Sequence, residues 1–221
     1  MRKNVSVLLI FLSIQILGIS ASNMVETKSF GELLNETLSK FDNNTSSDRF
    51  ATCVAELKRI AAVYPDEWIT YYYTALYEIQ QTFAGSSENN EELLNDAMIH
   101  IDMLKNNNKS DKSEISTIEG YYYYALIASN PKKNGQIYYK NVLEAYQKAL
   151  KYNPENPRAQ LLLLIFQLNM AAHMGNSDQG DISGKLIEIE SLLKKEEDSY
   201  LNPSWGEKTL FALKKKYSEK K

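Results

Sequence analysis

The sequence predicts an all-α protein, an α-solenoid of about four antiparallel helical hairpins followed by a C-terminal helix. Apolar residues recur three and four positions apart along most of the chain, which is the spacing of one helix face. Gly and Pro are scarce, with 9 and 5 copies in 221 residues. An aromatic block, Tyr71–Leu76, returns as Tyr121–Leu126. This internal repeat and the short polar turns between segments indicate helices that pair with their neighbours and stack.

The first four helices are expected over residues 30–41, 50–61, 68–83 and 93–104, each from an apolar stripe bounded by turn residues. Pro65 ends the second helix because proline cannot continue one. Gly85 closes the third, since glycine is favoured just after the last helical turn. Glu91 and Glu92 favour the start of the fourth because acidic side chains complement the positive end of a helix dipole.

The fifth and seventh helices are expected over residues 113–128 and 158–170, the sixth and eighth contain the apolar positions of 142–150 and 186–193, and a short ninth helix follows residue 206. Asn130 and Pro131 separate the fifth from the sixth. The seventh is apolar on nearly all its faces, so we expect it in the middle of the stack. The loops are too short to be interdomain linkers, so residues 22–221 are predicted to form a single domain.

One helix carries a repeating pattern of small, aromatic and proline residues, at Val142, Tyr146, Ala149 and Pro154. Small residues let two helices approach, an aromatic ring fills the groove between units, and proline ends the helix. In the tyrosine blocks the same counting places Ala75 and Ala125 where two helices cross. It also predicts that Tyr71 and Tyr121 pack inward.

The chain resembles a family of exported bacterial proteins with tetratricopeptide-like (TPR-like) repeats. The resemblance covers roughly residue 50 to the C-terminus and rests on three stretches, Tyr64–Trp68, Asn153–Ala159 and Pro203–Gly206. It implies an all-helical, non-enzymatic periplasmic protein of undefined role. A Phe-Gly-Gly-Gly turn of that family is only partly kept here, in Met174–Gly180. The structural repeat positions are Pro65, Trp68, Tyr71, Ala75, Tyr121, Ala125, Tyr146, Ala149, Pro154 and Trp205.

The tyrosines are the main candidates for a binding surface, with 15 in the chain. Tyr72 and Tyr122 occupy the position that lines the concave side of TPR stacks, Leu161 is the equivalent in the third unit, and Arg158 adds a charge. We expect a groove that binds a protein or peptide segment. The alternative is a periplasmic binding protein that holds a small apolar or aromatic ligand in a tyrosine-lined pocket. The rings could instead only fill the packing between units.

Nothing in the sequence predicts catalysis, a cofactor or a metal site. Asp96 and His100 lie one helical turn apart, but zinc needs three or four ligands. The stretch Gly180–Lys185 lacks the spacing and the preceding strand of a phosphate-binding loop. A net charge of −3 gives no general reason to bind nucleic acid. The C-terminal lysines are expected to complement a helix dipole.

Residues 1–21 are predicted to be a signal peptide. Arg2 and Lys3 precede an apolar stretch, Val5–Ile19, and the small residue Ala21 follows it. The stretch is shorter than the roughly 20 residues that a spanning helix needs. We therefore expect an exported protein, periplasmic or secreted, without stable membrane insertion after signal cleavage.

Overall fold

The computed structural model describes residues 28–43, 46, 48–84, 89–175, 180–197 and 199–218. These residues form α-helices and no strand, so the all-α prediction is confirmed. Residues 1–21, the predicted signal peptide, and Gly85 lie outside the described part. The helices are α1 (Phe30–Asn43), α2 (Arg49–Val63), α3 (Trp68–Phe83), α4 (Asn90–Asn106), α5 (Lys112–Ser129), α6 (Pro131–Tyr152), α7 (Pro157–His173), α8 (Ile182–Lys195) and α9 (Glu207–Ser218).

Four helices begin at a side chain that caps their first turn. The N-cap residues Asp111, Asn130, Asn156 and Asp181 each accept a hydrogen bond from a backbone N–H three residues later. Such caps satisfy donors that the helix itself leaves unpaired. Helix α6 starts at residue 131, directly after the predicted break, because Asn130 caps it and Pro131 fits its first turn.

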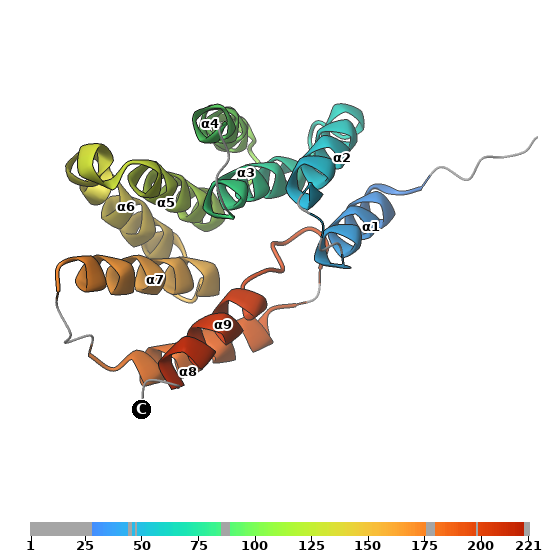
Figure 1. Cartoon of the computed structure of the whole chain (residues 1–221). Helices are drawn as coiled ribbons and strands as arrows, with labels where there is room; N and C mark the ends of the chain where they lie inside the picture. Colours follow the sequence, from blue (N-terminus) through green and yellow to red (C-terminus); the bar gives the residue numbers. More distant parts are fainter. Residues whose placement is uncertain are drawn as a thin grey trace, which may run out of the picture.

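Each helix packs against its neighbour in sequence, and α5 also contacts both α3 and α7 (Figure 1). In Figure 1 helices α2 to α6 form the upper part of the molecule, and α7, α8 and α9 lie below them. This pattern of neighbouring and alternate contacts is what stacked hairpins require. The TPR-like solenoid stays a prediction that this packing supports. None of the described helices is long and apolar enough to cross a membrane.

The largest cluster of buried apolar residues is centred on α3, and a second joins α7, α8 and α9. Ala75, Ala125 and Ala149 are buried, with exposed fractions of at most 1%. Small side chains at such positions allow neighbouring helices to approach closely. The second cluster contains Leu161, Leu193 and Leu210, one from each of its three helices.

The connection between α8 and α9 runs back across the molecule toward α1 and α3 (Figure 1). The Ser204 backbone N–H donates to the Tyr73 hydroxyl at 2.9 Å, and the Trp205 indole Nε1 donates to the Tyr72 hydroxyl at 2.9 Å. The ring of Tyr200 meets Phe30 of α1 edge to face. This connection therefore ties the last two helices to the N-terminal half.

Candidate functional site

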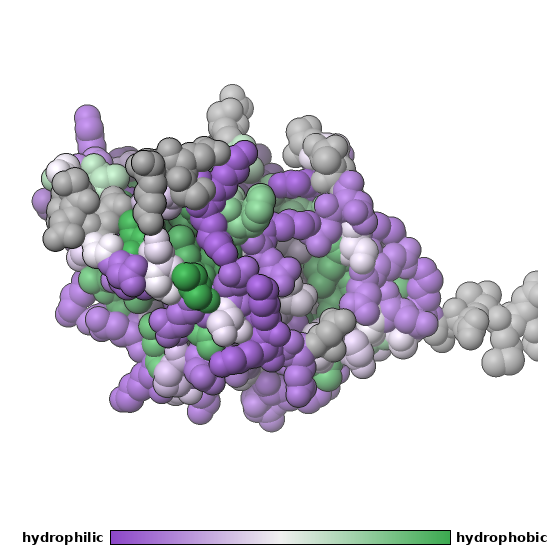
Figure 2. Space-filling model, turned by 90° about the horizontal axis from the view of Figure 1, so that it is seen from below, coloured by the Kyte–Doolittle hydropathy of each residue, from purple (hydrophilic) through white to green (hydrophobic). Residues whose placement is uncertain are grey.

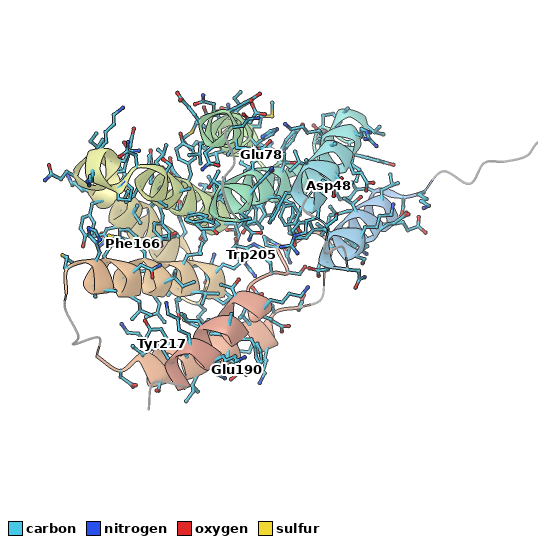
Figure 3. All side chains as sticks on the ribbon, viewed as in Figure 1. Asp48, Glu78, Phe166, Glu190, Trp205 and Tyr217 are labelled. Atoms are coloured by element: carbon cyan, nitrogen blue, oxygen red, sulfur yellow. The ribbon has the colours of Figure 1, made fainter. Side chains whose placement is uncertain are left out.

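The residues predicted to line a groove are buried. Tyr72 and Leu161 are 0% exposed, Arg158 is 4% exposed and Tyr122 is 8% exposed. Tyr71 and Tyr121, which we expected to pack inward, are partly buried and pack against the core. Within each tyrosine block the second ring is therefore buried more completely than the first. For Tyr72 the reason is the α8–α9 connection, whose Trp205 lies between α3 and the lower helices (Figure 3).

Tyr72 and Arg158 belong to one buried hydrogen-bond network around the carboxylate of Glu114. This carboxylate accepts from the Tyr72 hydroxyl at 2.7 Å, from Asn156 Nδ2 at 2.8 Å and from Arg158 Nε at 3.0 Å. Burial raises the pKa of Glu114, and the Arg158 guanidinium opposes that rise. Burial also raises the pKa of Tyr72 well above its ordinary value. The network is a satisfied structural unit, since each charged group in it has a partner.

Arg158 also joins the ends of α8 and α9. Its Nη1 and Nη2 donate to the two carboxylate oxygens of Glu196, which follows α8. Its Nη1 lies 3.4 Å from the backbone oxygen of Trp205, just before α9. A bidentate arginine–carboxylate pair is among the strongest and most directional contacts in proteins. Arg158 therefore sets the spacing of these two helix ends.

The predicted groove is not open in this structure, because its four residues are buried: Tyr72, Tyr122, Arg158 and Leu161. That they bind a ligand stays a prediction, and it now requires the segment 203–206 to move away from α3. The described residues place an accessible groove elsewhere.

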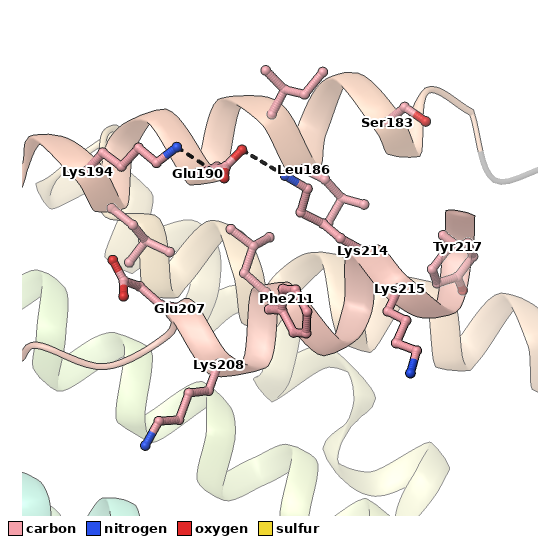
Figure 4. A pocket seen from close by; sticks show the side chains of 13 residues that line it. Ser183, Leu186, Glu190, Lys194, Glu207, Lys208, Phe211, Lys214, Lys215 and Tyr217 are labelled. Carbon is pink, nitrogen blue, oxygen red and sulfur yellow. Dashed lines mark hydrogen bonds and ion pairs between the residues drawn. The ribbon is translucent and has the colours of Figure 1, made fainter. Parts of the chain in front are cut away.

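That groove lies between α8 and α9, with a volume of about 1060 Å³ (Figure 4). Its apolar lining includes Leu186, Ile187, Leu193, Leu210, Phe211 and Tyr217. Three leucines form the floor and belong to the core cluster shared with α7. Ile187 and Phe211 remain 64% and 71% exposed. Large apolar side chains this exposed and this close together indicate a binding surface.

Figure 2 shows the side of the molecule on which α8 and α9 lie. Hydrophobic residues gather there among hydrophilic ones. The hydrophilic lining of the groove consists mainly of charged side chains, Glu190, Lys194, Glu207, Lys208, Lys214 and Lys215. A ligand in this groove would meet apolar side chains below and charged groups at the edge.

Glu190 connects the two sides of the groove. Its carboxylate accepts from Lys194 on the same helix at 3.2 Å and from Lys214 on α9 at 2.7 Å (Figure 4). These two ammonium groups hold the pKa of Glu190 below its usual range. Lys208, also on α9, pairs with Asp42 of α1 at 2.8 Å.

Two of the predicted site residues support the groove from beneath, although neither lines it. Leu161 of α7 packs in the same cluster as the leucines of the floor. Arg158 holds the helix ends that bound the groove, through Glu196 and Trp205. Sequence reasoning missed the groove because it followed the tyrosines.

A signal for the groove was nevertheless present in the sequence. Leu186 and Ile187 are neighbours on one helix, as are Leu210 and Phe211 on the next. Consecutive helical residues point about 100° apart, so a helix that buries one of them in a single core leaves the other near solvent. Lysines follow both pairs, so each helix has a second face on which apolar and charged side chains lie side by side.

Within the described residues no group of three or more His, Cys, Asp or Glu side chains could hold a metal ion. His100 is buried, and its Nδ1 lies 2.8 Å from the carboxylate of Glu78. The second oxygen of Glu78 pairs with Lys58 at 3.0 Å. Asp96, the neighbour expected for His100, pairs with Lys58 instead. This histidine is therefore part of a polar cluster within the helix stack, in which His100 and Glu78 are buried and Lys58 and Asp96 remain exposed.

The sequence matches no protein-family model and no curated protein. A solved structure, the HusA haemophore from Porphyromonas gingivalis, is similar to this chain, with 26% sequence identity and a TM-score of 0.73. The match covers 86% of this chain and 93% of HusA. It supports the all-α fold over most of the chain. The resemblance to the TPR-like family stays a prediction.

Proposed function

We propose that this chain is a non-enzymatic binding protein that carries haem in the groove between α8 and α9. The observation that carries the proposal is an accessible apolar groove with a lysine-rich edge, in a chain similar in structure to a haemophore. Of the two functions expected from the sequence, this one develops the small-ligand alternative. It places the ligand away from the tyrosine blocks.

The groove suits haem in size and chemistry. Its volume of about 1060 Å³ is at the upper end of the roughly 300–1,000 Å³ typical of ligand pockets. Haem is planar and largely apolar, and it carries two carboxylates. The leucine floor with Ile187 and Phe211 would contact the flat ring, and the lysines would meet the carboxylates. Tyr217, also in the lining, is of a residue type that holds haem iron in some proteins.

Binding of a protein or peptide segment in the concave groove is the second candidate. What favours it is that an extended segment, residues 203–206, already contacts Tyr72 and Tyr73. A foreign segment would have to displace this one and break its hydrogen bonds. The groove between α8 and α9 requires no such displacement, so we place haem binding first. In both cases we propose an exported carrier, which rests on residues 1–21 of the sequence.

Titration of haem into the purified protein tests the proposal, followed by the Soret absorbance and by quenching of tryptophan fluorescence. Ile187→Asp places a charge on the apolar wall of the groove, so we expect haem affinity to fall at least about tenfold. Ile99→Asp is the matched control, because Ile99 is also exposed and lies on α4, outside the groove.

The control variant should bind haem as the unmodified protein does. Equal haem affinity for both variants would place the ligand elsewhere, and no saturable binding by the unmodified protein would refute haem transport.

A further inference from the structure

We infer that Trp205 is a positioning residue for the groove between α8 and α9, and that its contact with α3 controls how tightly the groove holds its ligand. Trp205 itself does not line the groove. The inference rests on the proposed function and adds a means of regulation to the same groove. It predicts that a change on α3, outside the groove, alters ligand affinity.

The contacts that the segment 203–206 makes with α3 are the first step in the argument. The Trp205 indole Nε1 donates to the Tyr72 hydroxyl at 2.9 Å, and the Ser204 backbone N–H reaches the Tyr73 hydroxyl at the same distance. The Tyr72 hydroxyl is in turn fixed by the buried carboxylate of Glu114, to which it donates at 2.7 Å. Two tyrosines of one helix, 0% and 2% exposed, thus hold the segment on α3.

The contacts on the groove side are the second step. Gly206 directly precedes α9 and has a φ of 124°, which favours glycine. A Cβ atom built on it would lie 3.3 Å from Cδ2 of Leu193, a residue of the groove floor. The backbone oxygen of Trp205 lies 3.4 Å from Nη1 of Arg158, which also holds the end of α8. The position of Trp205 therefore fixes the start of α9 relative to α8.

The ion pairs of α9 are the third step, because they are weaker anchors than Trp205. Lys208 pairs with Asp42 of α1, and both side chains are more than half exposed. Lys214 pairs with Glu190 of α8, and both are about one-third exposed. Pairs this exposed exchange readily with water. The hydrogen bond of Trp205 is more directional, because its acceptor is fully buried and is itself hydrogen-bonded.

The dependence of affinity on the spacing of α8 and α9 completes the argument. A ligand in the groove contacts both helices, and a gap of roughly 0.5–1 Å forfeits a quarter to a half of a dispersion contact. The groove therefore binds best while the segment 203–206 lies on α3. By linkage, a bound ligand also holds the segment there. A foreign protein segment that displaced residues 203–206 would release the ligand, which connects the two candidate functions.

Haem titration of variants, followed by the Soret absorbance, tests the inference. Trp205→Ala removes the hydrogen bond and the ring together, so the segment should leave α3 for much of the time and haem affinity should fall at least about tenfold. Trp205→Phe keeps a ring, so we expect a fall of about two- to threefold. Tyr73→Phe removes the acceptor of the Ser204 N–H and should also lower haem affinity about two- to threefold.

Tyr124→Phe is the matched control. It removes the hydroxyl of another partly buried tyrosine, which accepts from Asn169 Nδ2 at 2.6 Å and lies outside both the segment 203–206 and the groove. Haem affinity should stay as in the unmodified protein. Circular dichroism and thermal unfolding of each variant check that the helices persist, and they separate a loss of affinity from a loss of stability.

The reciprocal effect is measured by hydrogen–deuterium exchange with mass spectrometry. The amides of residues 204–206 should exchange at least about twofold more slowly in saturating haem, because the ligand holds the segment on α3. Direct shielding by the ligand would not explain this slowing, since residues 203–206 do not line the groove. The turn 107–110, also outside the groove, should exchange at the same rate with and without haem.

The possible results separate this inference from the proposed function. If the unmodified protein binds haem, then unchanged affinity in folded Trp205→Ala and Tyr73→Phe would overturn the role of Trp205. An equal loss of affinity in Tyr124→Phe would overturn it as well, and so would equal exchange of residues 204–206 with and without haem. Failure of the unmodified protein to bind haem would refute the proposed function and, with it, this regulation.

Discussion

Two tyrosine side chains, Tyr72 and Tyr146, are fully buried but differ in what their hydroxyl groups contact. Tyr72 donates to Glu114 and accepts from Trp205. The Tyr146 hydroxyl has no hydrogen-bond partner among the described residues. A buried hydroxyl stabilises the fold only if it is paired, and it costs free energy if it is not. The same aromatic residue thus has opposite energetic roles at these two positions.

Replacing each of these tyrosines by phenylalanine should therefore have opposite effects on stability. Tyr72→Phe leaves Trp205 Nε1 without its acceptor and takes one donor from Glu114, so we expect a loss of about 1–3 kcal/mol. Tyr146→Phe removes only an unpaired hydroxyl, so the protein should keep its stability or gain a little. Denaturant unfolding measures both changes. An equal loss for the two variants would contradict this account.

At the scale of elements, α5 and α6 pack closely because a glycine faces an aromatic ring. A Cβ atom built on Gly120 of α5 would lie 2.7 Å from Cε1 and 2.9 Å from Cδ1 of Tyr146 on α6. Such distances are shorter than van der Waals contact allows. Tyr146 is fully buried, so its ring has little room to move away. Gly120 therefore determines how near the two helices come.

Gly120→Ala should destabilise the protein by about 1–3 kcal/mol through overpacking. This outweighs the roughly 0.5–1 kcal/mol that alanine gains over glycine within a helix. Gly135→Ala in α6 provides the control, because a Cβ there would meet nothing within 4 Å. That variant should be more stable by about 0.5–1 kcal/mol. Thermal unfolding of both variants measures the difference in sign, and a stabilising Gly120→Ala would refute the close approach.

At the scale of the whole molecule, the tyrosines are spread through the helix stack and are held in their neutral form. Burial raises the pKa of Tyr72, Tyr121 and Tyr146, which lie on α3, α5 and α6. In the unfolded chain a tyrosine ionises near pH 10. Below that pH the folded and unfolded states carry these phenols in the same form. Above it the unfolded state releases protons that the folded state keeps, so stability falls as the pH rises.

We therefore expect cooperative alkaline unfolding beginning above about pH 10. Tyrosinate ultraviolet absorbance and helical circular dichroism, recorded against pH, should change together. Tyr146→Phe should delay the transition because one buried phenol is removed. Complete ionisation of the tyrosines with the helices intact would show that the rings are accessible to water.

Most of the secondary structure could be predicted because it depends on local patterns. The apolar spacing, Pro65 and the capping residues act within a few positions of the chain. The apolar pattern around residues 142–150 did not locate the start of α6, since Asn130 and Pro131 both end one helix and begin the next. Which of the candidate surfaces stays open could not be predicted from the same patterns. Whether Tyr72 faces solvent depends on Trp205, which is 133 residues away in the sequence.

The amino-acid sequence by itself determined the all-α class, the order of the helices and the burial of small residues such as Ala75 and Ala125. These follow from the 3.6-residue period of the helix and from side-chain size. Only the tertiary structure decided which surface stays open. The α8–α9 connection covers Tyr72 and engages Arg158, and the same connection leaves an apolar groove between its two helices. No local sequence pattern predicts contacts between segments so distant in the chain, because these contacts depend on how the helices pack.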